Sequence, residues 1–171
     1  AAQVRHTGFG ITHVGPLRAA ASDDATAAHH AASWLNDAGL APILHDDMRP
    51  FVWQKAIVNH AVNPVAARER VPNGALLHGP LRTESHTILE EAYALSRAAG
   101  VALPGGHAGL EDALWGTLER TKDNHCSMLQ DREAARPTEL EQISGRLVRL
   151  GRRLGFPMFA SEETYRRMKE T

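Results

Sequence analysis

The sequence predicts a mainly α-helical protein preceded by a short β-α-β segment. Apolar residues in the range 49–171 recur at three- and four-residue steps, the spacing of the buried face of an amphipathic helix. Residues 1–48 instead hold two short strand-like runs on either side of an alanine-rich stretch. With 43% hydrophobic and 23% charged residues, the composition is that of a globular protein. A length of 171 residues suits one domain, or one domain with part of another.

Residues 1–48 are expected to form a β-α-β piece. The run 11–14 is β-branched and is bounded by glycines, and the run 41–45 is apolar, with Pro42 placing it at a sheet edge. Between them, residues 22–38 predict a helix that ends at Gly39. Two strands make a marginal sheet, so we expect this piece to be the end of a sheet that begins elsewhere.

Residues 49–171 are expected to form a separate helical domain. We predict that Pro64 interrupts or kinks the first helix, and that the third helix continues from Leu118 towards Met128 and Leu129. Thr138 and Glu141 predict a capping box at the start of the fourth. The predicted helices cover residues 50–62, 80–99, 110–118, 138–154 and 161–170.

Charge and cysteine content exclude several functional classes. The chain has 19 basic and 20 acidic residues, which argues against a protein that binds nucleic acid or a membrane surface. No apolar run approaches the roughly 20 residues of a membrane span. The single cysteine, Cys126, cannot form a disulfide within the chain and suits a reducing compartment, so we expect a cytoplasmic protein.

Neither a nucleotide loop nor a metal site is expected. Gly8 and Gly10 resemble the start of a dinucleotide loop, but Gly15 follows Gly10 by five residues instead of three, so a plain turn is favoured. The ten histidines include pairs such as His29 and His30, yet none has the spacing of a known metal motif. Solvated surface histidines are the simpler interpretation.

Three polar side chains share one face of the helix that begins near residue 50. Lys55, Asn59 and Asn63 follow one another at four-residue steps, and the residues between them include Ile57, Val58 and Val62. The row fits the wall of a polar ligand pocket, where amides donate and accept hydrogen bonds and lysine supplies a charge or a proton. A solvent-facing stripe explains the spacing equally well.

A second polar group lies further along the chain. Ser127 belongs to the run Ser-Met-Leu-Gln-Asp, and Glu139 falls in the first turn of the helix predicted after Thr138. There the negative charge of Glu139 suits the helix dipole. Taken alone, these residues are best explained as a surface hydroxyl and a dipole partner.

Together these motifs resemble a known family. They are Trp53-x-Lys55-x-x-x-Asn59-x-x-x-Asn63-Pro64, then Pro72-Asn73-Gly74, then Ser127–Asp131 and Arg136-x-Thr138-Glu139. In this order they look like the C-terminal domain of ketopantoate reductase (2-dehydropantoate 2-reductase), and residues 8–15 resemble the end of that family's N-terminal domain. The resemblance covers nearly the whole chain, although each motif alone is weak.

The resemblance implies a helical C-terminal domain of the 6-phosphogluconate-dehydrogenase-like type over 49–171, preceded in 1–48 by a β-α-β remnant of a Rossmann-type sheet. It implies reduction of 2-dehydropantoate to pantoate, with NADPH bound mainly by a domain absent from this chain. Lys55 matches the proton donor, and Glu139 matches the acid near the nicotinamide ribose and the reacting centre. The residues that match substrate-binding positions are Asn59, Asn63, Asn73 and Ser127.

Two further interpretations stay open. The chain could be a non-catalytic paralogue that serves as a helical dimerisation or small-molecule-binding module, or a reductase of another 2-oxo acid. The expected partner is a small 2-oxo acid, with no nucleic acid and no membrane, and a homodimer stays open. We expect the isolated chain to be inactive, because the nucleotide-binding loop is not in it.

Overall fold

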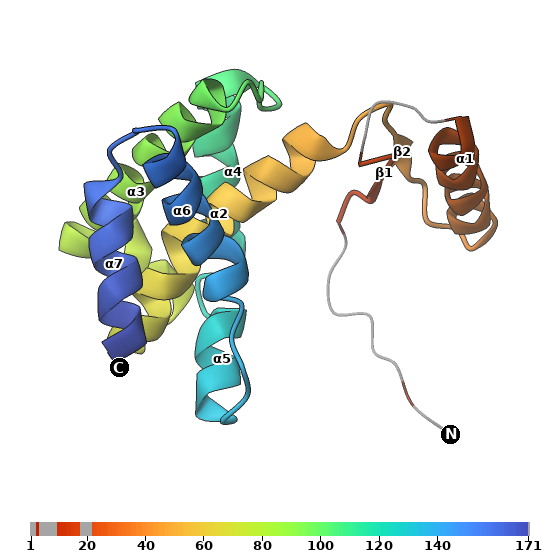
Figure 1. The fold of residues 1–171 in the computed structure, drawn as a ribbon. Coiled ribbons are helices and arrows are strands. Elements are labelled where there is room, and N and C mark those ends of the chain that lie inside the picture. The colour runs from red at the N-terminus through yellow and green to blue at the C-terminus, as the bar shows by residue number, and fades with distance from the viewer. Residues whose placement is uncertain (1–2, 4–9, 18–21, 171) are drawn as a thin grey trace. The chain divides into compact units, whose positions relative to one another are not determined.

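A computed structural model describes residues 3, 10–17 and 22–170 of the chain (Figure 1). Contacts divide the chain into two compact units, Ala1–Arg49 and Pro50–Thr171. This division falls next to the boundary expected between residues 48 and 49. That residues 1–48 belong to a dinucleotide-binding domain stays a prediction. No helix in the described part of the chain is long and apolar enough to cross a membrane.

The first unit has a β-α-β arrangement. Strand β1 (His13–Val14) pairs in parallel with β2 (Ile43–Leu44), and helix α1 (Ser22–Asp37) connects them. The ladder includes a hydrogen bond from the Ile43 amide to the Thr12 carbonyl at 2.8 Å. The strands are shorter than the predicted runs. The left-handed φ of +76° at Gly39, which favours glycine, lies just beyond α1, as the sequence predicts.

The second unit is helical, which confirms the predicted fold class. Its α-helices are joined by a 3₁₀ turn, η1, and a π-helical turn, η2. In chain order the elements are α2 (Arg49–Glu69), η1 (Asn73–Leu77), α3 (Gly79–Ala98), α4 (Gly106–Arg120), α5 (Ser127–Glu133), η2 (Glu141–Gly145), α6 (Arg146–Arg153) and α7 (Phe159–Glu170).

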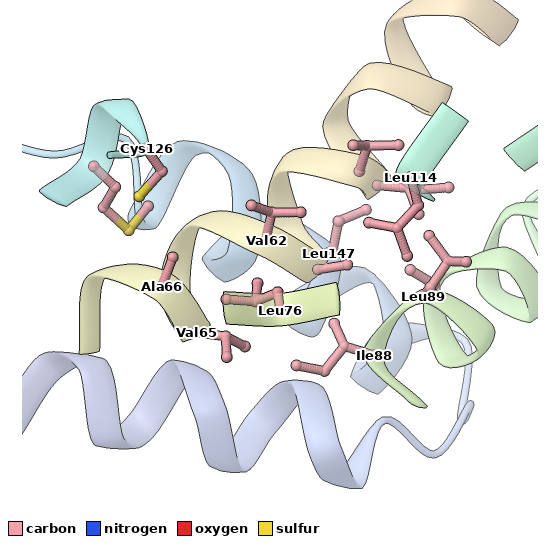
Figure 2. Packing of buried hydrophobic residues seen from close by; sticks show 14 of the residues in the cluster. Val62, Val65, Ala66, Leu76, Ile88, Leu89, Leu114, Cys126 and Leu147 are labelled. Atoms are coloured by element: carbon pink, nitrogen blue, oxygen red, sulfur yellow. The ribbon is translucent and has the colours of Figure 1, made fainter. Parts of the chain in front are cut away.

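Helix α2 supplies much of the hydrophobic core. Val62 and Val65 pack in one cluster with Leu76 of η1, with Ile88 of α3 and with further residues of α4 and α6 (Figure 2). Val65, Leu76 and Ile88 have no exposed surface. Because full burial of a Val, Leu or Ile side chain contributes about 1.5–3 kcal/mol, this cluster holds α2 firmly in place.

Pro64 does not end α2. The helix continues to Glu69, and Pro64 is buried inside it. A proline inside a helix removes one backbone hydrogen bond at a cost of about 3 kcal/mol. The residues that follow, Val65, Ala66 and Ala67, are completely buried, and their packing offsets this cost. Of the two predicted effects of Pro64, the interruption was therefore wrong because tertiary packing outweighs the local preference, and the kink stays a prediction.

Helix α4 does not continue to Met128 and Leu129 as predicted. It ends at Arg120, and α5 begins as a separate helix at Ser127. The intervening turn is held by η1, where the Asn73 amide donates to the Asn124 carbonyl and the Gly74 amide donates to the Lys122 carbonyl, both at 2.9 Å. These contacts come from a distant part of the chain, so helical periodicity alone could not reveal them.

The predicted capping box at Thr138 and Glu141 does not form. The Thr138 hydroxyl accepts a hydrogen bond from the Leu140 amide at 3.5 Å, but the Glu141 carboxylate points elsewhere. It accepts hydrogen bonds from Tyr165 of α7, from Arg149 and from Lys169. These bonds lower the pKa of Glu141 to about 2, and the bond from Tyr165 has the largest influence on it. The first turn here is π-helical, and α6 follows it.

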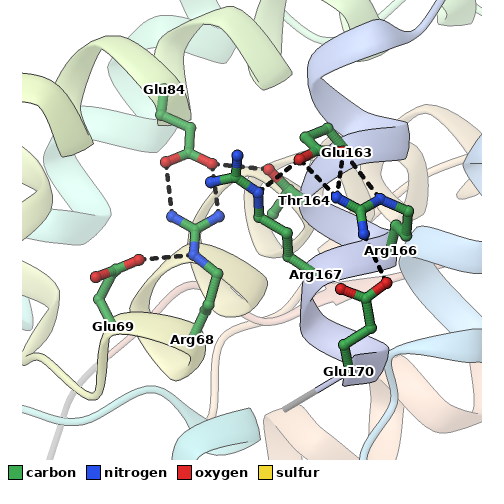
Figure 3. Close-up of polar contacts among 8 residues, drawn as sticks. All are labelled: Arg68, Glu69, Glu84, Glu163, Thr164, Arg166, Arg167 and Glu170. Atoms are coloured by element: carbon green, nitrogen blue, oxygen red, sulfur yellow. Dashed lines mark hydrogen bonds and ion pairs between the residues drawn. The ribbon is translucent and has the colours of Figure 1, made fainter.

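A polar network joins α2 to α3 and α7 (Figure 3). The Arg68 guanidinium donates two hydrogen bonds to the Glu84 carboxylate, each 2.8 Å long, and a third to Glu69 at 2.7 Å. The Thr164 hydroxyl donates to Glu84 at 2.8 Å. The Arg68 side chain is only 9% exposed, so Glu84 supplies the charge that a buried guanidinium requires.

Candidate functional site

Helix α2 carries the first polar residues of the site. Asn59 is half-buried and Asn63 is buried, with 6% of its surface exposed, and both lie on the face predicted from their four-residue spacing. The packing of Val58 and Val62 beside them fixes the rotation of the helix. The hydrophobic core therefore fixes the direction in which this face of α2 presents the two amides.

Asn73 of η1 contributes a third amide. Its Nδ2 donates to the Thr121 hydroxyl at 2.8 Å, and that hydroxyl donates to the Thr117 carbonyl at 2.8 Å. The Asn73 Oδ1 atom is buried and has no hydrogen-bond partner among the described residues. A buried acceptor without a partner costs about 1–3 kcal/mol, so a ligand that donated a hydrogen bond to this atom would recover that cost.

Gly74 permits the close approach of η1 to the turn after α4. A Cβ atom at this position would lie 2.9 Å from both the carbonyl oxygen and the Cβ of Lys122. Any larger residue would push the turn away from η1 and would displace Asn73, which precedes Gly74 in the chain. Glycine is thus required here by space, because its φ is not in the left-handed region.

Cys126 positions Ser127 at the start of α5. Its Sγ accepts a hydrogen bond from the Leu129 amide at 3.4 Å and donates to the Asn63 carbonyl at 3.6 Å. Burial raises the pKa of the Cys126 thiol, so the thiol keeps the proton that it donates. Through this contact α5 is attached to α2 at Asn63, with the exposed Ser127 next to it in the chain.

The side chains that line one cavity of about 580 Å³ include Asn59, Asn63, Asn73 and Ser127. These four residues come from three separate elements, α2, η1 and α5. The lining also includes the apolar Val58 and Val62. A cavity of this size suits a small organic ligand, and convergent amides and hydroxyls beside apolar side chains can fix its orientation.

Lys55 and Glu139 are not among the residues that line this cavity. Lys55 is exposed on α2, one turn before Asn59, and Glu139 is exposed in the bend before η2. The cavity therefore brings together the three asparagines and Ser127 but not Lys55 or Glu139, and the roles of all six residues stay predictions.

Further residues of the cavity were missed from the sequence. Thr117 and Thr121 lie one turn apart at the end of α4, and Asn124 follows in the turn that η1 holds. The i, i+4 spacing of the two threonines was a visible signal. Gln130 of α5 also lines the cavity, and its Nε2 donates to the His125 carbonyl at 2.7 Å.

Comparison with known proteins identifies the family. Residues 47–170 match the model of the family described as "Ketopantoate reductase PanE/ApbA C terminal". The chain is 34% identical over 168 residues to 2-dehydropantoate 2-reductase of Vibrio cholerae, covering 98% of this chain and 54% of that protein. It is 32% identical over 153 residues to the enzyme of the same name from Archaeoglobus fulgidus, with 89% and 49% covered.

Solved structures agree with the sequence comparison. A PanE/ApbA family ketopantoate reductase from Ralstonia eutropha superposes with a TM-score of 0.82 at 27% identity, covering 97% of this chain and 52% of that one. Thus the chain spans about half the length of the relatives it matches. The match to the family model over most of the chain, together with relatives above 30% identity, shows that this protein belongs to the ketopantoate reductase family and carries that family's C-terminal domain.

Proposed function

We propose that this chain is the substrate-binding half of an NADPH-dependent 2-dehydropantoate 2-reductase, which reduces 2-dehydropantoate to pantoate on the route to pantothenate. The observation that carries the proposal is the cavity in which Asn59, Asn63, Asn73 and Ser127 come together. Each occupies the position that the family motif assigns to a substrate contact. Relatives of which this chain covers about half are named for this activity.

The substrate offers groups that match these side chains. It carries a carboxylate, a ketone and a hydroxyl, and it therefore needs both donors and acceptors. Ser127 and the amide N–H groups donate to the carboxylate end, and the buried Oδ1 of Asn73 accepts from the hydroxyl. The apolar Val58 and Val62 suit the carbon skeleton between the polar ends.

In this proposal Lys55 acts as the proton donor. Reduction of a ketone adds a hydride to carbon and leaves negative charge on oxygen, which a proton neutralises. A lysine ammonium can release its proton, whereas an arginine guanidinium effectively cannot. Lys55 is one of only three lysines in the chain, and it lies on the same helix as two of the asparagines.

The hydride would come from a bound nicotinamide cofactor. Among the residues of this chain, the family motif places only Glu139 near it, and an exposed carboxylate is a suitable acceptor for a ribose hydroxyl. The described residues before α1 offer no glycine-rich phosphate loop, so we propose that most of the cofactor is bound outside this chain and that the isolated chain is inactive. We also propose that the enzyme is cytoplasmic and that it forms a homodimer.

The test is NADPH oxidation in the presence of 2-dehydropantoate, measured on a protein that carries this chain together with a nucleotide-binding domain. Asn59→Ala should lower kcat/KM about 10- to 100-fold, the effect of losing one hydrogen bond to a charged ligand, worth about 1.5–3 kcal/mol. Gln142→Ala is the matched control, since Gln142 is exposed and lies outside the cavity.

Two other outcomes would replace the proposal. No NADPH oxidation with any 2-oxo acid would favour a binding or dimerisation module. Faster turnover of another 2-oxo acid, still sensitive to Asn59→Ala, would keep the reductase and change its substrate. Equal effects of Asn59→Ala and Gln142→Ala would show that the cavity is not the substrate site.

A further inference from the structure

Two histidines and two glutamates form a cluster between α3 and α4. His86 Nε2 lies 2.9 Å from Glu111 Oε1 and 3.5 Å from Glu90 Oε1. His107 Nε2 lies 2.5 Å from the same oxygen of Glu90. Ligand atoms of His86, Glu90 and Glu111 all lie within 4.8 Å of one another. All four side chains are between about a third and half exposed, so an ion in solution can reach them.

The cluster is built from the same spacing on both helices. His86 and Glu90 are four residues apart on α3, and His107 and Glu111 are four residues apart on α4. Side chains four residues apart lie on one face of a helix, so each helix presents one imidazole and one carboxylate. The pairs cross over, with His86 contacting Glu111 and His107 contacting Glu90, and the cluster therefore joins the two helices.

Neighbouring aromatic side chains support both imidazoles. The Trp115 ring stacks on His86, with ring centres 6.0 Å apart, and the Arg82 guanidinium lies 3.9 Å above the Trp115 ring. Tyr93 meets His107 edge-on at 5.0 Å. Rings held in this way lose less conformational freedom when they bind an ion than free surface histidines do.

We propose that His86, Glu90 and Glu111 bind a divalent metal ion of the Zn²⁺ type, and that the His107 ring donates a hydrogen bond that orients Glu90. Zinc bonds to nitrogen and oxygen ligands are about 2.0–2.2 Å long, so neighbouring ligands of a tetrahedral ion are separated by about 3.3–3.5 Å. The two distances from His86 Nε2, 2.9 and 3.5 Å, are close to this value. Ligand atoms of all three side chains already lie within 4.8 Å of one another, so the side chains need to move little to reach one ion.

The ligand set distinguishes among metals. Imidazole nitrogen with two carboxylates suits Zn²⁺ and similar transition-metal ions, whereas Mg²⁺ and Ca²⁺ prefer ligand sets of oxygen alone. A hydrogen bond to a ligating carboxylate, as from His107 to Glu90, is a common second contact at such sites. None of the four residues lines the cavity of Asn59 and Ser127, so the metal site does not depend on the proposed reductase function.

The experiment is calorimetric titration of Zn²⁺ into the untagged chain after removal of metals with a chelator. We expect one strong site per chain. His86→Ala and Glu111→Gln should each weaken binding at least about 100-fold, because even residues that only orient a ligand contribute about 10–100-fold. His107→Ala should weaken it about tenfold. His78→Ala is the control, since His78 is exposed at the start of α3 and outside the cluster.

Trp115 provides a second measurement. Because its ring stacks on His86, Co²⁺ bound at the site should quench its fluorescence in a Trp34→Phe, Trp53→Phe background, and excess Zn²⁺ should reverse the effect. Circular dichroism verifies that each variant folds. If Zn²⁺ does not bind, if Mg²⁺ binds equally well, or if His86→Ala and His78→Ala bind alike, the proposal is wrong.

Discussion

Because Arg68 and Glu84 form an ion pair, we expect the free energy of unfolding of the protein to depend on pH. Glu84→Gln keeps the shape of the side chain but removes the charge opposite a guanidinium that is only 9% exposed. One of the two hydrogen bonds from Arg68 is lost, because the amide nitrogen of glutamine cannot accept it. Glu69 still contacts Arg68, which keeps the loss moderate. Since hydrogen bonds to charged groups contribute about 1.5–3 kcal/mol, we expect a loss of about 2 kcal/mol in the free energy of unfolding at pH 7.

The pH dependence follows from the pKa of Glu84. Its hydrogen bond with Arg68, the largest influence, keeps this pKa below the ordinary value. A carboxyl group with a lowered pKa in the folded state contributes its full stability above the unfolded pKa, about 4.3, and loses it as the pH falls through the folded pKa. The difference between the wild type and Glu84→Gln should thus be largest near pH 7 and should disappear in acid.

Urea unfolding followed by circular dichroism measures this difference at each pH. Glu163→Gln is the matched control, because Glu163 forms ion pairs with Arg166 and Arg167 on the surface of α7. Solvent screens such pairs, so its effect should be much smaller. The reasoning is refuted if the two variants lose equal stability, or if the loss caused by Glu84→Gln does not change with pH.

Three further predictions concern the core, the reaction and the cofactor. Leu114→Ala, at a fully buried position in the core, should lower the free energy of unfolding measured in urea by about 2–5 kcal/mol. A loss below about 1 kcal/mol would show that the core closes the cavity left by the leucine side chain. Lys55→Arg in the enzyme that carries this chain should lower kcat about 10²–10⁴-fold, and a nearly normal kcat would reject Lys55 as the proton donor. Calorimetry should detect no micromolar binding of NADPH to the isolated chain. Such binding needs about 8 kcal/mol, whereas hydrogen bonds to Glu139 contribute about 1 kcal/mol each.

Helix ends were predictable where a single residue decides them. Gly39, Gly100 and Gly155 each have a left-handed φ, between +64° and +76°, and each follows a helix end predicted from the sequence. This conformation is costly for residues with a Cβ, so glycine after an apolar repeat is a local signal. No knowledge of the rest of the fold is needed to read it.

Other features depend on partners far away in the chain and could not be predicted. Pro64 remains helical because of the core around α2. The Glu141 carboxylate accepts a hydrogen bond from Tyr165 of α7 instead of capping the helix as expected. The His86 cluster has no linear motif, because each helix supplies only half of the ligands. These partners become neighbours only after folding.

The residues of the candidate site likewise include some that local spacing predicts and others that depend on distant parts of the chain. Helical spacing alone places Asn59 and Asn63 on one face, as the structure has them. Asn73 and Ser127 were expected beside them only through resemblance to the family, since residue spacing cannot show that η1 and α5 meet α2. The same limit explains why Thr121 and Asn124, which the contacts of η1 bring to the cavity, were overlooked.

The position of Cys126 allows its chemical modification to serve as a probe of the folded protein. The thiolate is the form that alkylating reagents attack, and burial of Cys126 disfavours that form in the folded state. We therefore expect modification to require openings in which α5 separates from α2, so that its rate measures how often such openings occur. Because Cys126 is the single cysteine in the sequence, mass spectrometry of the whole chain measures thiol modification at this one site. A small molecule bound in the cavity that Cys126 lines should slow the modification, which provides a ligand screen that needs neither turnover nor an attached dye.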